Sequence, residues 1–462
     1  MFEKFANIFR IPDLRKRVLF TLALLAVYRI GGHLPTPGIN TRVLENLFNQ
    51  QGGTMLGFID LFSGGFLRRM TIFALGIMPY ITASIILQLL TVVYEPLKRL
   101  QNEGELGRKK ITQWTRYLTV VLSALQSTAI AVTLERQAGV VLHPGLRFVL
   151  MTILTLTTGS AFIMWLGEQI TERGVGNGMS LLIFAGIVVG LPRAVGDLYT
   201  KVRDQAWGAM TVPGMLFLIA VMIVVVAFIV YVERSERRIP VQYAKRVIGR
   251  KVMGGQSTHL PLRVNSGGVM PVIFASSVLT LPQTLGMFLK GKNAHLDDMV
   301  AAMNWGEPLY TLLYALGIIF FAYFYVSIVF NPSEVSGNMQ KYGGFIPGIR
   351  PGKRTADYIN DILTRITFVG ALYLIVISII PEWMIAGIHL NHLPVWLGGN
   401  FFERFPNFVL NGLGVNFYFG GTSLLIVVGV AMDTVNQIEA QLLMRHYEGF
   451  TPRSGRIRGR RW

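Results

Sequence analysis

The chain has 462 residues, of which 52% are hydrophobic and 15% are charged. Soluble proteins average about 25% charged residues, so a soluble enzyme, a disordered protein and a fibrous protein are excluded. The net charge is nevertheless +18, from 43 Lys and Arg against 25 Asp and Glu. A chain that is both apolar and basic must place these residues in different regions, as a polytopic membrane protein does.

The residue types that enzymatic chemistry needs are missing. The chain has no cysteine, which excludes disulfides, a thiolate nucleophile and a Cys-ligated metal. The seven histidines fall in predicted loops or near span ends, without a His-Glu-x-x-His pair, and no Gly-x-Ser-x-Gly motif is present. The glycine-rich run 174–178 follows no predicted strand, so we interpret it as a tight turn or hinge. We predict no enzymatic activity and no metal or organic cofactor.

Apolar runs long enough to cross about 30 Å of hydrocarbon occur ten times along the chain. We predict helices, because lipid offers no partner for open backbone groups. The first run follows basic residues as in a signal peptide, but it continues into Tyr28 and Arg29 without a cleavage site, so it is predicted to remain as a span. The predicted spans are 17–35, 71–91, 114–134, 148–168, 179–199, 212–232, 268–289, 309–330, 364–386 and 417–437.

The distribution of Lys and Arg predicts which side of the membrane the two termini occupy. An even number of spans places both termini on one side of the membrane. Of the 43 Lys and Arg, 31 lie on that side, 11 lie on the other, and Arg29 lies within the first span. Positive residues are retained in the cytoplasm, so both termini are predicted to be cytoplasmic. The predicted fold class is an all-α integral membrane protein.

Five predicted spans lie on either side of about residue 205, which suggests two halves, 1–205 and 206–440, followed by a basic tail, 441–462. An odd number of spans per half is compatible with an inverted repeat, as in secondary transporters. A coupled transporter needs buried carboxylates, however, and we interpret Asp433 as a residue at the cytoplasmic end of the last span. A path through these spans would be apolar and uncharged. A membrane scaffold without conduction also remains open.

Two predicted cytoplasmic loops, 233–264 and 331–361, are long for simple connectors. In the second loop, Gly and Pro residues between Gly343 and Gly352 predict tight turns that hold Arg350 at a projecting tip. The basic residues of both loops fit three partners: anionic lipid headgroups, structured RNA or an acidic protein surface. Lipid attraction is the default for charge beside a membrane. The first loop, however, carries its charge farther out than headgroup contact requires.

Two further features have alternative interpretations. The apolar external segment 55–69 is too short to span, and its residues alone favour a position at the interface over folding back into a cavity. Polar residues within spans, including Thr82, Gln88 and Ser276, are typical of hydrogen bonds to a neighbouring helix. The same groups could also line a seam between helices that opens.

Long ordered motifs resemble the SecY family, whose members form the central subunit of the bacterial protein-conducting channel, and the resemblance covers essentially the whole chain. The motifs are Phe62–Gly65, Ile72–Ile81, Trp165–Gly174, Tyr243–Arg246, Gln256–Leu262, Gly348–Gly352 and Tyr418–Leu425. The resemblance implies ten helices in two five-helix halves, with a constriction midway. It implies a channel that passes unfolded preproteins across the membrane and releases transmembrane segments laterally into it.

The resemblance also implies roles for individual residues. A ring of apolar side chains would close the pore: Ile77, Ile81, Met179, Ile183, Ile273 and Ile426. The segment 55–69 would be a plug beyond this ring, which reverses the interfacial interpretation, with Phe58, Phe62, Gly64 and Gly65 among its residues. The lateral gate would include Thr82, Gln88 and Ser276. Met179 stands where the family commonly has Ile, and a flexible thioether should still close the ring.

The partners implied by the resemblance are the SecE and SecG subunits, the SecA ATPase, the ribosome, the signal sequences of preproteins and membrane lipids. The ribosome and SecA would bind through Lys245, Arg246, Arg250 and Arg350. The implied location is the bacterial cytoplasmic membrane. The chain departs from the family in a long external insertion, about 387–416, for which the sequence offers no function.

Overall fold

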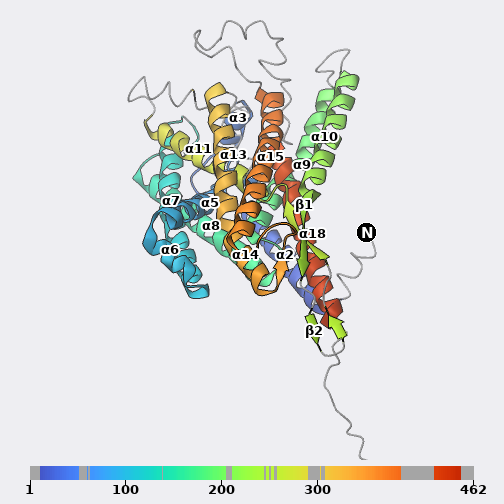
Figure 1. Cartoon of the computed structure of the whole chain (residues 1–462). Coiled ribbons are helices and arrows are strands. Elements are labelled where there is room, and N and C mark those ends of the chain that lie inside the picture. The colour runs from blue at the N-terminus through green and yellow to red at the C-terminus, as the bar shows by residue number, and fades with distance from the viewer. Residues whose placement is uncertain are drawn as a thin grey trace, which may run out of the picture.

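A computed structural model describes most of the chain. The described residues are 11–50, 60, 63–137, 139–203, 211–243, 246–248, 251–253, 257–289, 302, 307–386 and 421–448. The predicted insertion 387–416 and the tail beyond residue 448 therefore lie outside the described residues. The described part is mostly helical (Figure 1).

Each of the ten predicted ranges contains a helix. These helices are α2 (Pro12–Gly31), α5 (Met78–Val93), α7 (Glu105–Glu135), α8 (Leu146–Arg173), α9 (Gly178–Arg203), α10 (Thr211–Arg234), α11 (Met270–Leu289), α13 (Pro308–Val329), α15 (Lys353–Ala386) and α18 (Gly421–Glu448). Three shorter helices are α3 (Thr41–Gln50), α6 (Glu95–Asn102) and α14 (Pro332–Lys341).

Length and composition support fewer crossings than ten. Within the described residues, five helical segments are long and apolar enough to cross a membrane: Glu105–Glu135, Leu146–Arg173, Pro308–Lys341, Lys353–Ile380 and Ser423–Leu442. A sixth is possible if α5 and α6, which meet at a bend of 104°, count together as one span. The chain is thus a helical membrane protein, and the count of ten spans stays a prediction.

Helix boundaries differ from the predicted ones at one place that matters for the site. The span predicted from residue 71 begins as a helix only at Met78, because residues 64–77 are turns. Gly76 adopts a positive φ of 58° there, which favours glycine, and Pro79 occupies the first turn of α5. The apolar run 71–77 therefore folds as compact turns and is buried without being helical.

The two long loops contain strands that the sequence analysis did not predict. β1 (Glu236–Tyr243) and β4 (Ser257–Arg263) form an antiparallel hairpin, in which Glu236 pairs with Arg263. β5 (Gly344–Phe345), from the second loop, pairs with the other edge of β1 to give the sheet order β4-β1-β5. β2 (Arg246–Ile248) and β3 (Lys251–Met253) form a separate two-stranded sheet. One sheet thus joins the two loops.

An apolar cluster fills the centre of the helices and includes residues from both predicted halves. The helix α11 packs against both α5 and α7, while α9 and α10 pack against α18. A second, smaller cluster lies beneath the sheet and contains Ile239, Leu262, Ile346 and Ile359. The division into halves at about residue 205 falls on residues outside the described part and stays a prediction.

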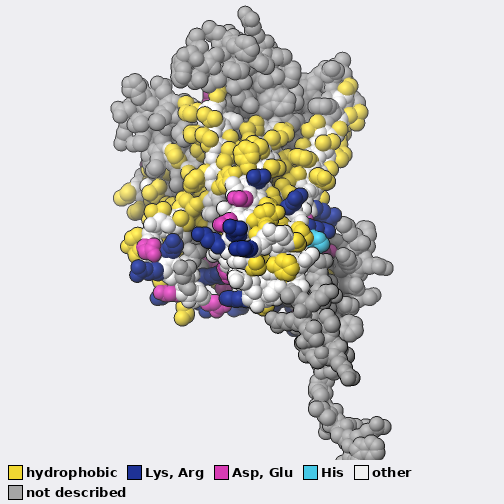
Figure 2. All heavy atoms as spheres, viewed as in Figure 1, with side chains coloured by type: hydrophobic (Ala, Val, Ile, Leu, Met, Phe, Trp, Pro, Cys, Tyr) yellow, Lys and Arg dark blue, Asp and Glu magenta, His cyan; other side chains and the backbone are white. Residues whose placement is uncertain are grey.

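The surface separates apolar from charged side chains along the helices. Figure 2 shows hydrophobic side chains over α10, α13 and α15 in the upper part of the view. Lys, Arg, Asp and Glu gather in the lower part, over α6, α14 and the sheet. This segregation explains how one chain can be both apolar and basic. The apolar surface suits lipid, and the charged surface suits water.

Helix packing depends on a glycine of α8. A Cβ added to Gly159 would overlap the backbone carbonyl of Ile72, so α8 lies directly against the turns 64–77. We predict that Gly159→Ala lowers the free energy of unfolding by about 1–3 kcal/mol, because the added methyl group overpacks this contact. Thermal unfolding of the solubilised protein measures the effect.

The matched control is Gly196→Ala in α9, where an added Cβ has no atom within 4 Å. This substitution should leave stability unchanged or slightly higher, because alanine favours helix. Equal effects of the two substitutions would contradict the proposed contact.

Candidate functional site

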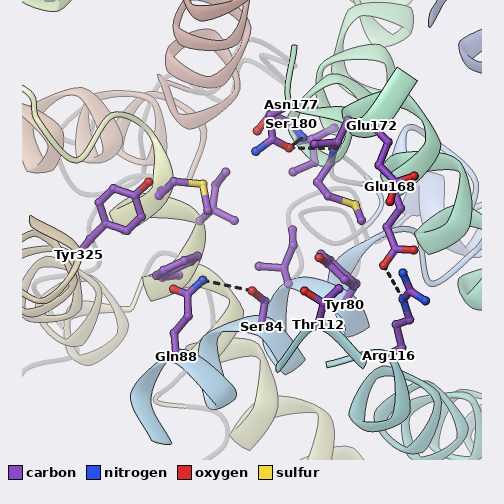
Figure 3. A pocket seen from close by; sticks show the side chains of 17 residues that line it. Tyr80, Ser84, Gln88, Thr112, Arg116, Glu168, Glu172, Asn177, Ser180 and Tyr325 are labelled. Carbon is purple, nitrogen blue, oxygen red and sulfur yellow. Dashed lines mark hydrogen bonds and ion pairs between the residues drawn. The ribbon is translucent and has the colours of Figure 1, made fainter. Parts of the chain in front are cut away.

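A cavity of about 410 Å³ lies among the central helices, with walls from α5, α7, α8, α9, α11 and α13 (Figure 3). One part of its wall is apolar and another carries polar and charged side chains. The polar lining residues include Tyr80, Ser84, Gln88, Thr112, Arg116, Glu168, Glu172, Asn177, Ser180 and Tyr325.

The apolar wall contains four of the six residues expected to form the ring: Ile81, Met179, Ile183 and Ile273. The other two are Ile77 and Ile426, and all six belong to the central apolar cluster. The five isoleucines are at most 6% exposed, whereas Met179 is partly buried. Four helices and the turn before α5 thus bring these side chains together, although up to 349 positions separate them in the chain.

The turn between α8 and α9 positions Met179. The Asn177 side chain accepts hydrogen bonds from the backbone N–H groups of Met179 and Ser180, at 3.0 and 3.4 Å, and so caps α9. Gly178 lies against the backbone carbonyl of Gly167, and only glycine permits so close an approach of α9 to α8. The run 174–178 is therefore a tight turn between helices, as predicted.

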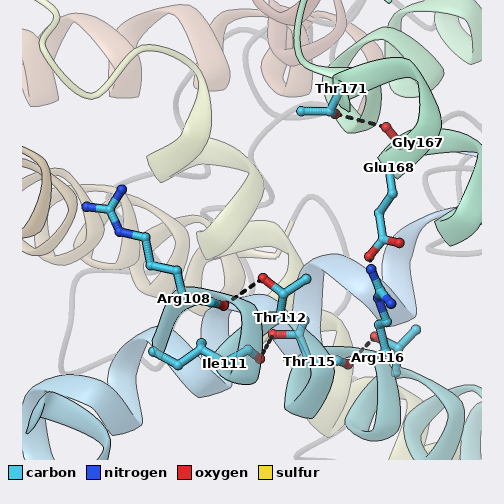
Figure 4. Close-up of polar contacts among 9 residues, drawn as sticks. Arg108, Ile111, Thr112, Thr115, Arg116, Gly167, Glu168 and Thr171 are labelled. Atoms are coloured by element: carbon cyan, nitrogen blue, oxygen red, sulfur yellow. Dashed lines mark hydrogen bonds and ion pairs between the residues drawn. The ribbon is translucent and has the colours of Figure 1, made fainter. Parts of the chain in front are cut away.

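An ion pair forms part of the polar wall. Nε of Arg116 in α7 donates to Oε1 of Glu168 in α8 at 2.8 Å (Figure 4). The side chain of Glu168 is 14% exposed, and that of Arg116 is 46% exposed. Nearby, Thr171 accepts from the backbone N–H of Gly178 at 2.9 Å and ties α8 to the start of α9. The pair joins two helices of the cavity wall without leaving a lone charge.

The polar residues of the expected gate bond within their own helices. Thr82 donates to the carbonyl of Met78, Gln88 to the hydroxyl of Ser84, and Ser276 to the carbonyl of Ile273. Such bonds satisfy polar groups without linking α5 to α11. The expected bonds to a neighbouring helix are not among these contacts, and the gate stays a prediction.

The groups that line the cavity do not form a metal site. Within the described part of the chain, no cluster of three or more His, Asp or Glu residues is placed to hold a metal ion. The polar side chains present are amides, hydroxyls, the ion pair of Arg116 and Glu168, and the carboxylate of Glu172. A wall of this kind can exclude water and ions at its apolar part, and it can bind a polypeptide by weak, exchangeable contacts at its polar part.

Comparisons with known proteins decide the family. A family model described as SecY matches residues 71–435. The protein translocase subunit SecY of Escherichia coli K12 is 47% identical over 442 residues, which cover 94% of this chain and 93% of that protein. The chain belongs to the SecY family. This membership confirms the resemblance that the sequence motifs indicated.

Solved structures of SecY and Sec61 channels share the fold. One is a SecY structure described by the role of its plug domain in stabilising the closed channel and maintaining a membrane seal; the TM-score is 0.63, at 18% identity, over 95% of this chain and 94% of that one. Another is Sec61 in a canine ribosome-channel complex, with a TM-score of 0.56, at 18% identity and the same coverage. At this identity the likeness establishes the SecY fold alone.

Part of the plug expected from the SecY resemblance lies within the described residues. Phe58 and Phe62 lie outside them, whereas Gly64 and Gly65 lie in turns with positive φ. A Cβ on Gly64 would be 2.8 Å from the Cα of Gly186, so this turn lies directly against α9. Buried Phe66 then packs in the central cluster. The described end of the segment is therefore held inside the protein.

Only some of the expected docking residues lie within the described residues. Lys245 and Arg250 lie outside the described residues, and Arg246 is described only as part of β2. Arg350 is exposed, and its carbonyl accepts a hydrogen bond from the Thr355 hydroxyl at 2.9 Å. Gly348 and Gly352 have positive φ values of 83° and 102°, so tight turns do hold Arg350 in a defined loop, as predicted.

Sequence reasoning missed the ion pair and the sheet. Arg116 and Glu168 are 52 residues apart, and neither stands out within its own span. The strand β5 has only two residues, too few to give a periodic pattern. No local signal could have identified either feature.

The ion pair predicts an energetic coupling between α7 and α8. In a double-mutant cycle of Arg116→Gln and Glu168→Gln, we expect a coupling of about 1 kcal/mol, because the partly exposed arginine weakens the pair. Thermal unfolding of the three variants and the parent protein measures it. Additive effects would show that the two side chains do not interact in solution.

Proposed function

We propose that the chain is the pore-forming subunit of a protein-conducting channel in the bacterial cytoplasmic membrane. It passes unfolded preproteins across the membrane and releases transmembrane segments laterally into the lipid. The observation that carries this proposal is a central cavity with an apolar wall and a polar wall in a chain of the SecY family. The E. coli relative is named a translocase subunit. The cavity offers no chemistry of its own, so partners supply the energy.

In the proposed closed pore, Ile77, Ile81, Met179, Ile183, Ile273 and Ile426 form the ring. Their burial in one apolar cluster supports this role, since an apolar constriction disfavours the passage of water and ions. The plug, about 55–69, lies beyond the ring. The contact of Gly64 with Gly186 and the burial of Phe66 support a plug that docks on α9.

The proposed lateral gate lies between α5 and α11, the helices that carry Thr82, Gln88 and Ser276. Two observations support it. The helices α5 and α7 pack directly against α11. The hydrogen bonds recorded for Thr82, Gln88 and Ser276 stay within single helices, so those bonds persist when the helices separate. On opening, the apolar contacts between α5 and α11 would be replaced by contacts with lipid or with the transmembrane segment that leaves the channel.

The partners proposed are SecE, SecG, SecA and the ribosome, with both termini in the cytoplasm. The sheet β4-β1-β5 lies at the charged end of the helices, which is the surface that a cytoplasmic partner would meet (Figure 2). Arg350, in the loop that follows β5, is exposed. A solved Sec61 channel of the same fold was found in a complex with a ribosome. Lys245, Arg246 and Arg250 belong to the same proposed docking surface.

Reconstitution tests the function. Proteoliposomes that contain the chain with SecE and SecG, together with SecA and ATP, should protect a preprotein from external protease. Omission of ATP is the control and should abolish protection, because the chain itself supplies no energy. Absence of ATP-dependent uptake with all components present would contradict the proposal.

Polar substitution tests the ring. We expect Ile183→Asn to raise the ion conductance of the resting channel in planar bilayers, because a polar side chain in the constriction favours water and ions. Ile183→Leu, which keeps the wall apolar, should leave conductance at the level of the parent protein. Equal conductance of all three would remove Ile183 from the ring, and it would favour a scaffold without conduction.

A further inference from the structure

A buried asparagine lies where the hairpin of β1 and β4 meets the helices. Asn265, which is 5% exposed, lies in the turn 264–269 that connects β4 to α11. Its Nδ2 group donates to Oε1 of Glu233 at 2.6 Å and to the carbonyl of Gly268 at 3.1 Å. Both partners are pure acceptors, so the orientation of the amide follows from the network.

These two bonds connect separate elements. Glu233 lies in the last turn of α10, immediately before β1, whereas Gly268 lies two residues before the start of α11. The backbone adds a third link, because the N–H of Val264 donates to the carbonyl of Ser235 at 3.0 Å. Asn265 therefore fixes both ends of the hairpin to the beginning of α11.

Two neighbouring helices close around this junction. A Cβ on Gly370 of α15 would lie 2.7 Å from the carbonyl oxygen of Val264, so α15 touches the backbone beside Asn265. A Cβ on Gly429 of α18 would lie 2.8 Å from Val269. Gly370 thus packs against backbone and Gly429 against a side chain of the connection. The hairpin base and the start of α11 therefore share one closely packed junction.

The environment of Glu233 makes its partner important. Glu233 lies just beyond the predicted span 212–232, and its burial raises the pKa of its carboxyl, while the hydrogen bond from Asn265 opposes that rise. A half-buried carboxyl that loses its partner is destabilised. Loss of the amide would therefore remove the side-chain link between α10 and the start of α11, and only the backbone bond between Val264 and Ser235 would remain.

We propose that Asn265 is a positioning residue that couples the hairpin of β1 and β4 to α11, so that a protein partner seated on the hairpin moves α11 with it. Ile273 lies eight residues after Asn265 on the cavity wall, and Ser276 follows in the proposed gate. The part of this inference that concerns a partner rests on the proposed function. The rigid coupling itself does not.

The absence of native cysteine allows a direct test of rigidity. Spin labels at Thr258→Cys in β4 and Val278→Cys in α11 report the distance between hairpin and helix in the full chain. We expect a narrow distribution in the parent protein and one about twofold broader with Asn265→Leu, which removes both hydrogen bonds. A distribution as narrow as that of the parent would overturn the proposal.

Three variants make the result specific. Glu233→Gln keeps an acceptor for Asn265 and should keep the narrow distribution. Arg263→Ala removes an exposed ion pair with Asp433 at the same junction, 3.6 Å long, and should also leave the distribution unchanged. If Asn265→Leu does not fold, Asn265→Ser, whose side chain is too short to reach both acceptors, carries the same expectation.

Reconstituted translocase supplies the second readout. With Asn265→Leu we expect SecA to bind with unchanged affinity but preprotein uptake to fall about tenfold, because binding no longer moves α11. Unchanged uptake, or a loss of uptake that follows weakened binding, would overturn the coupling. Failure of the parent protein to take up preprotein would instead contradict the proposed function, and the distance measurement would still decide the rigidity.

Discussion

The structure depends on one constraint: backbone polar groups in lipid must be bonded inside the protein, while the side chains that face lipid must be apolar. A channel for polypeptides adds an opposite demand, since its path has to accept polar chain without leaking water and ions. The arrangement of the central helices meets both. Apolar side chains face lipid on the outside, and a second apolar set packs at the centre around Ile183 and Ile273. Polar side chains lie beside the central set, at the wall of the same cavity.

Glycine permits this double packing. At Gly159, Gly178 and Gly64, helix or turn backbone lies directly against other backbone. Close approach brings the side chains at the centre together. Between α5 and α11 the side-chain hydrogen bonds of Thr82, Gln88 and Ser276 stay within single helices, whereas elsewhere polar bonds join elements, as between Arg116 and Glu168.

The charged end of the molecule is built on different principles. There the two loops share one sheet, a small apolar cluster lies beneath it, and ordinary hydrogen bonds and caps fix its turns. Asn331, for example, caps α14 by accepting from the N–H groups of Ser333 and Glu334. Such a region can stay rigid in water. This charged end therefore differs from the apolar helices, whose central contacts are mostly between apolar side chains.

The sequence by itself determined the class of protein, the ranges of the main helices and the side on which charge gathers, because these depend on local composition and on span length. The motif resemblance supplied the family and the candidate residues. Only the tertiary structure decided that residues 71–77 are turns, that Arg116 meets Glu168, and that β5 joins β1. An apolar residue that faces lipid and one that faces a closed cavity look alike in a sequence. Contacts between distant segments separate them, and those exist only in the folded chain.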